Sequence, residues 1–157
     1  MKRIALFADV QNIYYSIRQA HGRHFDYSKL WAEVAARGQI VEAVAYATDR
    51  GDPKQRQFQQ ILRNLGFVVK LKPYIQRSDG SAKGDWDVGI TLDIFEAASG
   101  VDEVVLVSGD GDFDMLLERV RERYGTESLV YGAPGLTAQS LVRAATTYIP
   151  IEEPLLI

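Results

Sequence analysis

The chain has 157 residues, of which 46% are hydrophobic and 25% charged, with a formal net charge of -3. This size and composition predict one globular domain over residues 1–157. The absence of cysteine excludes disulfide partners, thiol nucleophiles and thiolate metal sites, and two histidines disfavour a zinc enzyme. No apolar run approaches the roughly 18 residues that span a membrane, and no secretory signal is recognised at the start. We therefore expect a cytoplasmic protein without membrane contact.

Strand-like and helix-like segments alternate along the chain. Short apolar runs predict strands at residues 3–8, 40–48, 67–71, 103–107, 126–131 and 148–151. Helical spacing and capping residues predict helices at residues 11–20, 26–38, 52–66, 85–98, 112–124 and 137–145. Residues 73–84 are expected to form a long polar loop. The alternation predicts an α/β fold, a three-layer α/β/α sandwich with a central, mostly parallel sheet of five or six strands.

Charge is distributed unevenly over these elements. Between Asp49 and Lys83, eight lysines and arginines accompany three aspartates, whereas from Gly84 onward four arginines accompany fourteen acidic residues. One interpretation is the ordinary charge of a solvated surface. The other is a basic flank beside an acidic metal pocket, which suits a polyanion held by its phosphates while a metal acts on one of them.

Three aspartates follow the apolar run at residues 104–107, in the segment Ser108-Gly109-Asp110-Gly111-Asp112-Phe113-Asp114. Like charges in one turn repel unless a counter-charge is present, and hard divalent cations prefer carboxylate oxygens. Asp9 and Asn12 follow the first predicted strand. Because parallel strands end at the same edge of a sheet, these groups are expected to converge. Alternatively, Asp9 and Asp112 simply cap the helices that follow them.

The helix predicted at residues 85–98 is apolar on most sides, so we expect it to be well buried. Asp85 is interpreted as its N-cap. Asp87 and Asp93 lie within it, and a buried carboxylate is costly unless it is paired, hydrogen-bonded or bound to a metal. Six positions apart, the two point in directions about 120° different. Asp87 is expected to face the pocket, and Asp93 to orient a neighbouring group or to pair with a base such as Arg143.

Residues 9–12 (DVQN), residues 83–88 (KGDWDV) with Asp93, and residues 108–113 (SGDGDF) together resemble the NYN domain, and within it the LabA-like group of bacterial proteins in the PIN-like nuclease superfamily. The resemblance extends from about residue 3 to residue 149. It implies an acidic pocket at the strand ends and metal-dependent ribonuclease activity with Mg²⁺ or Mn²⁺. The additional acid at Asp85 departs from many relatives and leaves open which of Asp85 and Asp87 lies closer to the metal.

The resemblance implies a set of catalytic positions, with Asp9, Asp87 and Asp110 as ligands of one or two metal ions. Asp112 would complete the ligand shell or position the attacking water, and Asn12 and Ser108 would bind a phosphate oxygen, the water or a ligating carboxylate. The full predicted catalytic set is Asp9, Asn12, Asp87, Ser108, Asp110 and Asp112.

RNA is the expected partner, in single-stranded or flexible form. The basic residues expected to contact its phosphates are Lys83, Arg50, Lys54, Lys72 and Arg77. Tyr14, Tyr15 and Tyr74 are candidates for stacking on unpaired bases, although the spacing of Tyr14 is more typical of a core position. Two other functions stay open: an RNA-binding or regulatory module with little or no turnover, and a small-molecule phosphatase. The chain could also form a homo-oligomer.

Overall fold

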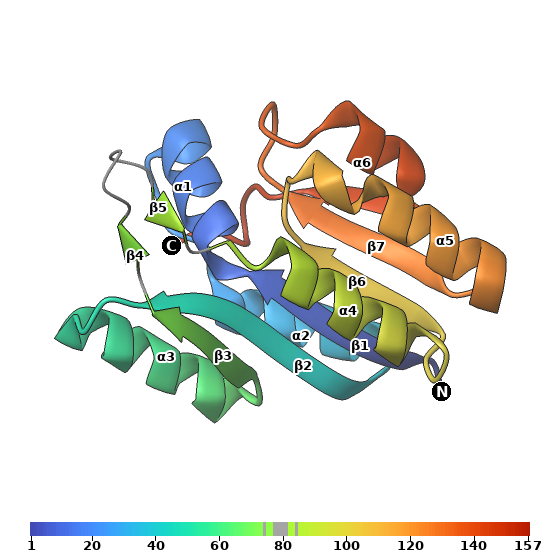
Figure 1. Cartoon of the computed structure of the whole chain (residues 1–157), viewed down its shortest axis with the longest axis horizontal. Coiled ribbons are helices and arrows are strands. Elements are labelled where there is room, and N and C mark those ends of the chain that lie inside the picture. Colours follow the sequence, from blue (N-terminus) through green and yellow to red (C-terminus); the bar gives the residue numbers. More distant parts are fainter. Residues whose placement is uncertain (74, 77–81, 84) are drawn as a thin grey trace.

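A six-stranded sheet forms the centre of this computed structural model, which describes residues 1–73, 75–76, 82–83 and 85–157 (Figure 1). In spatial order the strands are β3 (Val68–Pro73), β2 (Gln39–Asp49), β1 (Arg3–Asp9), β6 (Glu103–Val107), β7 (Glu127–Gly132) and β8 (Thr147–Pro150). All neighbouring strands are parallel. The predicted α/β fold is confirmed, with six strands in an all-parallel sheet.

Helices cover both faces of this sheet, which gives the three predicted layers (Figure 1). They are α1 (Val10–His21), α2 (Tyr27–Arg37), α3 (Pro53–Leu65), α4 (Asp87–Ala98), α5 (Asp114–Tyr124) and α6 (Gln139–Ala144). The core on one face contains buried side chains of α1, α2 and α3, including Ile13, Leu30 and Leu62. The core on the other face contains those of α4, α5 and α6, including Ile90, Leu117 and Leu141.

The order of the strands changes direction at the middle of the sheet, between β1 and β6. The chain builds β1, β2 and β3 outward in one direction, then crosses to build β6, β7 and β8 in the other. β1 and β6 are therefore neighbours at the point where the winding reverses, and both of their carboxyl ends open onto one crevice. Parallel α/β sheets bind ligands at such switch points.

Capping residues begin two helices as the sequence predicts. The carboxylate of Asp26 accepts hydrogen bonds from the backbone nitrogens of Ser28 (3.1 Å) and Lys29 (3.2 Å) before α2. The carboxylate of Asp52 accepts one from the Lys54 nitrogen (2.9 Å) before α3, with Pro53 at the first helical position. Both contacts satisfy amide groups that a helix leaves without partners in its first turn.

Helix α4 is less buried than the sequence predicts. Its inner side packs on the sheet through Ile90 and Ile94, but Val88 is 72% exposed and Leu92 63% exposed. The helix covers one face of the sheet and turns its opposite side to solvent, so an apolar composition did not indicate burial on all sides. Tyr14 of α1 is likewise exposed rather than part of the core, since Ile13 beside it fills the inward position.

The loop predicted at residues 73–84 contains two short antiparallel strands, β4 (Ile75–Gln76) and β5 (Ala82–Lys83). A 3-10 turn, η1 (Gly111–Phe113), precedes α5, so the helix predicted from residue 112 begins instead at Asp114. Among the described residues, no helix has the length and apolar character needed to cross a lipid bilayer.

Candidate active site

The loop after β6 is shaped by close packing against the start of α6. A Cβ atom on Gly109 would lie 2.6 Å from the carbonyl oxygen of Leu136, and one on Gly111 would lie 2.8 Å from the Cβ of Ala138. The Ala138 nitrogen also donates a hydrogen bond to the Gly109 carbonyl (3.0 Å). Glycine at both positions lets the loop approach the segment before α6 closely, and this packing holds the aspartates beside the crevice.

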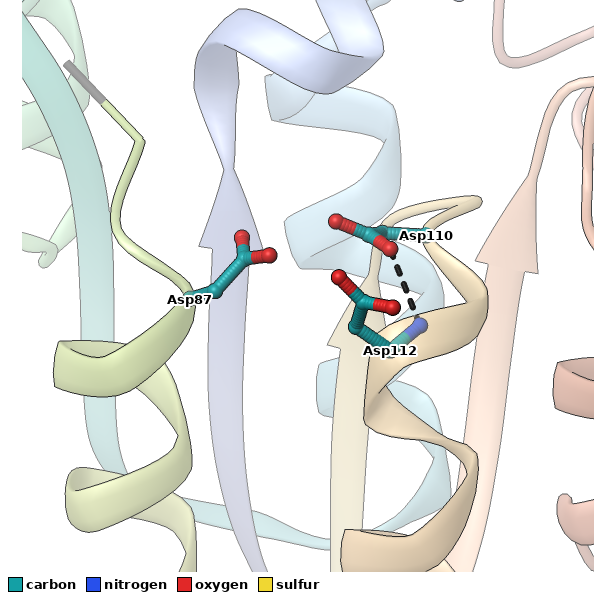
Figure 2. Close-up of side chains that lie close together, drawn as sticks. All are labelled: Asp87, Asp110 and Asp112. Carbon is teal, nitrogen blue, oxygen red and sulfur yellow. Dashed lines mark hydrogen bonds between the residues drawn. The ribbon is translucent and has the colours of Figure 1, made fainter. Parts of the chain in front are cut away.

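Asp110 starts the 3-10 helix η1. Its carboxylate accepts a hydrogen bond from the backbone nitrogen of Asp112 (2.9 Å), drawn as the dashed line in Figure 2. The Asp110 nitrogen in turn donates to the Ser108 hydroxyl (3.2 Å). The tight η1 turn directs the Asp112 side chain back toward Asp110 instead of along a regular helix.

The ends of β1 and β6 are joined beneath this loop by side-chain hydrogen bonds. The Ser108 hydroxyl donates to the Asp9 carboxylate (3.2 Å), and the Asn12 side-chain oxygen accepts from the Gly109 nitrogen (3.0 Å). Asp9 is 8% exposed. Burial raises the pKa of Asp9 to about 6, and the hydrogen bond from Ser108 opposes that rise only in part. Asp9 thus forms the buried floor of the site.

Asp87 reaches the site from the first turn of α4, and its neighbour Trp86 anchors that turn to the sheet. The indole nitrogen of Trp86 donates to the carbonyl oxygen of Ala47 in β2 (2.9 Å). The Trp86 ring packs 5.3 Å from the ring of Tyr46 and lies against Gly89, where a Cβ atom would be 2.7 Å from the ring. These contacts set where α4 begins, and therefore where Asp87 lies.

The carboxylates of Asp87, Asp110 and Asp112 converge at the mouth of the crevice, and we call these three residues the acid cluster (Figure 2). Each offers one oxygen, and the three oxygens lie within 4.8 Å of one another. Partial burial, reinforced by interactions with Asp110, Asp85 and Asp9, raises the pKa of Asp87 to about 7. Such a set of oxygen donors with excess negative charge fits a hard divalent cation.

A pocket of about 490 Å³ opens beside the acid cluster. Asp9, Asp85, Asp87 and Asp110 contribute its acidic lining, and α1 contributes a row of uncharged side chains. This volume lies within the range of about 300–1,000 Å³ that is typical of ligand sites.

The structure brings all six predicted catalytic residues to this one crevice. It places Asp112 with Asp87 and Asp110 at the spacing of metal ligands, whereas Asp9, interpreted from sequence as a ligand, lies at the floor with Ser108. The sequence predicts Asp112 at the start of a helix, as a group that completes the ligand shell or positions the water, but the 3-10 turn that redirects its side chain has no clear sequence signal. The glycines at 109 and 111 are the nearest indication of it.

The predicted RNA-contacting residues have different surroundings. Lys72 donates to the Asp85 carbonyl (3.0 Å) and lies 4.5 Å from the centre of the Trp86 ring, so it supports the start of α4. Arg50 and Lys54 are exposed just after the carboxyl end of β2. Arg77 lies outside the described residues, as does Tyr74, and of Lys83 only the backbone in β5 is described.

Asp93 pairs with a base, as the sequence predicts, but the base is Lys70 rather than Arg143. Its carboxylate accepts hydrogen bonds from the hydroxyl of Tyr46 and the ammonium of Lys70, each at 2.7 Å. The expected partner Arg143 is on α6, whereas Lys70 is on β3. This partly buried carboxylate, six residues after Asp87, ties α4 to strands β2 and β3 through the two donors.

The fold and the acid cluster together define a class of protein: a parallel α/β sandwich with a candidate metal-binding pocket at its switch point. The chain belongs to the NYN domain family, a PIN-like nuclease family, which matches residues 3–152. It is 33% identical to the low amplitude and bright protein LabA of Synechococcus elongatus, over 96% of this chain and 84% of that protein.

A solved structure of a similar chain has the same fold. The crystal structure of a protein of unknown function from Vibrio parahaemolyticus has 53% sequence identity to this chain and superposes with a TM-score of 0.94. The match covers 99% of this chain and 96% of the Vibrio protein. The likeness to the NYN domain and to the LabA-like group, which the motifs indicate, is therefore confirmed.

Proposed function

We propose that this protein is a metal-dependent ribonuclease that hydrolyses phosphodiester bonds in single-stranded or flexible RNA. The observation that carries the proposal is the convergence of the Asp87, Asp110 and Asp112 carboxylates within 4.8 Å at the switch point of the sheet. Membership of a nuclease family supports the same class of reaction. We also propose a cytoplasmic location.

The donor set fits Mg²⁺ or Mn²⁺. Both ions favour carboxylate oxygens, and the cluster contains no sulfur or imidazole ligand that would favour zinc or copper. Asp87, Asp110 and Asp112 would hold one ion. Asp9 lines the same pocket and would add a further ligand or serve a second ion. When bound, such an ion lowers the pKa of a coordinated water and neutralises charge on the scissile phosphate.

The residues of this chain hold and orient the reacting groups. The Ser108 hydroxyl accepts from the Asp110 amide and donates to the Asp9 carboxylate, and the Asp112 amide donates to the Asp110 carboxylate. Two of the four pocket carboxylates, Asp9 and Asp110, are therefore held through the loop after β6. Asn12 holds the Gly109 amide and so stabilises the same loop. Exposed cations at Arg50 and Lys54, and Lys83 on β5, would attract the RNA backbone toward this edge.

Cleavage of a labelled single-stranded RNA tests the proposal. We expect products with Mg²⁺ or Mn²⁺ and none in excess EDTA. Asp110→Asn should reduce the rate at least about 100-fold, because an amide is a much poorer ligand for a hard cation than a carboxylate. Asp114→Asn is the matched control: it removes the same charge from the same sequence run, outside the acid cluster, and should retain most activity.

The alternative outcomes are distinct. Cleavage that persists in EDTA would contradict the metal-dependent reaction. Salt-sensitive RNA binding without any metal-dependent product would instead identify an RNA-binding module. Thermal unfolding followed by circular dichroism shows whether Asp110→Asn is folded, so loss of activity is not confused with loss of structure.

A further inference from the structure

One face of α1 lines the same pocket as the acid cluster. Gln11, Tyr15 and Gln19 recur every four residues along the helix and therefore share one face, and all three line the pocket. Asn12 and Ser16 lie beside them. None of these five side chains carries a charge, which sets this wall apart from the acidic wall opposite.

The polar groups on this wall differ in how they are used within the protein. Asn12 binds the Gly109 amide, and the Ser16 hydroxyl donates to the Ile13 carbonyl (3.4 Å) of its own helix. Gln11 and Gln19 have no side-chain hydrogen bond to any residue that the structure describes. Each of these two amides can donate and accept hydrogen bonds.

Tyr15 lies between the two glutamines and is 50% exposed. Its ring is 5.3 Å from that of Tyr14 at an interplanar angle of 81°, an edge contact that restrains the Tyr15 side chain. A restrained aromatic ring next to hydrogen-bonding amides suits an unpaired nucleobase, which proteins recognise by stacking and by bonds to its edge.

Charge decides which part of a nucleotide this wall fits. A phosphate placed against α1 would face the carboxylates of Asp9, Asp85 and Asp87 across the pocket, with no cation among the α1 residues that line it. A neutral base escapes that repulsion. The phosphate joined to the base would then be the group that reaches the acid cluster.

We propose that Gln11, Tyr15 and Gln19 form a nucleobase subsite. An unpaired RNA base stacks on Tyr15, and its edge hydrogen-bonds to the amide of Gln11 or Gln19. This inference rests on the proposed ribonuclease function, since it names how the substrate is positioned for the same acid cluster. It assigns α1 the selection of the base beside the scissile phosphate.

Binding measurements test the subsite without requiring cleavage. Fluorescein-labelled decauridine RNA is compared with a decamer of abasic ribose phosphates, using proteins that all carry Asp110→Asn. Tyr15→Ala should weaken binding of decauridine about 5- to 150-fold, the range expected for loss of one base–aromatic stack, and should leave binding of the abasic probe unchanged. Tyr15→Phe should restore the affinity because it retains the ring.

Matched controls separate the subsite from general surface effects. Tyr124→Ala removes a comparably exposed tyrosine from α5, and Gln57→Ala removes an exposed glutamine from α3; neither should change the affinity for either probe. Gln19→Ala should alter the ratio of affinities for decauridine and decaadenine. The inference is overturned if Tyr15→Ala leaves decauridine binding unchanged, or weakens both probes equally.

The two proposals can fail separately. If the unmodified protein cleaves no RNA with Mg²⁺ or Mn²⁺ but Tyr15→Ala still selectively weakens decauridine binding, the ribonuclease proposal fails and the base subsite stands. If RNA is cleaved in a metal-dependent way, but Tyr15→Ala changes neither the base-dependent binding nor the KM for RNA, the subsite proposal fails and the ribonuclease proposal stands.

Discussion

At the scale of single residues, Asp87 shows how a binding site lowers the stability of the protein that carries it. Its carboxylate lies beside Asp110, and its pKa is raised to about 7 from an ordinary value of 3.8. The same residue is therefore harder to ionise in the folded protein than in the unfolded chain. A bound cation would offset the repulsion that burial and neighbouring carboxylates create.

The raised pKa values predict how stability depends on pH. Between about pH 4 and pH 7, folded Asp87 retains its proton while the unfolded residue has lost it, so the free energy of unfolding falls as the pH rises. Asp9, with a pKa of about 6, acts in the same direction. In EDTA, Asp87→Asn should therefore gain stability over the unmodified protein as the pH rises through this window.

Thermal unfolding at several pH values measures this effect. The difference in Tm between Asp87→Asn and the unmodified protein should grow from pH 4 to pH 7, and Mn²⁺ should reverse its sign by stabilising only the protein that retains the carboxylate. Asp114→Asn should show neither change. A Tm difference that stays constant with pH would contradict the assignment of the raised pKa to Asp87.

At the scale of secondary-structure elements, the start of α4 determines the geometry of the acid cluster. Trp86 anchors it through a hydrogen bond to Ala47, and Lys72 binds the Asp85 carbonyl from the neighbouring strand. Gly89 allows the Trp86 ring to lie directly on the helix. None of these residues belongs to the acid cluster, yet together they decide where Asp87 is presented.

Gly89→Ala tests this anchoring. Alanine for glycine within a helix ordinarily stabilises by about 0.5–1 kcal/mol. Here the new Cβ would lie 2.7 Å from the Trp86 ring, so the ring or the helix must shift. We expect no such gain in stability, and Mn²⁺ binding about tenfold weaker by isothermal titration calorimetry, in the range found when groups supporting metal ligands are altered.

Gly100→Ala provides the comparison, because its Cβ would meet only the Ala97 carbonyl oxygen, at 3.8 Å. It should leave Mn²⁺ affinity unchanged. Unaltered Mn²⁺ binding by Gly89→Ala would show that the Trp86 anchor does not position Asp87.

The elements also show which features local sequence patterns can predict. Alternating strand-like and helix-like periodicities were sufficient to predict the six strands of the sheet. The predicted carboxyl ends of β1 and β6 indicated where Asp9 and Asp110 would meet. The pairing of Asp93 with Lys70 depends on the neighbouring position of α4 and β3, and the exposure of Val88 depends on what covers the helix. Both are tertiary properties that helical periodicity does not encode.

At the scale of the whole molecule, the carboxyl ends and the amino ends of the strands, here called the carboxyl edge and the amino edge of the sheet, have different roles. The carboxyl edge holds the acid cluster, whose like charges disfavour folding. At the amino edge, Glu103 is 2% exposed and receives two hydrogen bonds from Arg37, at 2.9 and 2.7 Å, with Lys2 at 3.5 Å. A buried carboxylate paired in this way would be strongly destabilising if its partner were removed.

Arg37→Ala should therefore lower the stability of the protein without slowing RNA cleavage, whereas Asp110→Asn should slow RNA cleavage. Loss of Arg37 leaves Glu103 with Lys2 alone; because Arg37 is itself 32% exposed, we expect a cost of about 2 kcal/mol, below the about 3–5 kcal/mol of fully buried pairs. For a chain of this size, that loss lowers Tm by about 4–8 °C.

The rate of RNA cleavage by Arg37→Ala, measured well below Tm, should be unchanged because the pair lies at the opposite edge from the acid cluster. Arg119→Ala, at an exposed position on α5, should change neither quantity. A fall in cleavage rate with Arg37→Ala at a temperature where the protein is folded would mean that the two edges are coupled through β1 and β6.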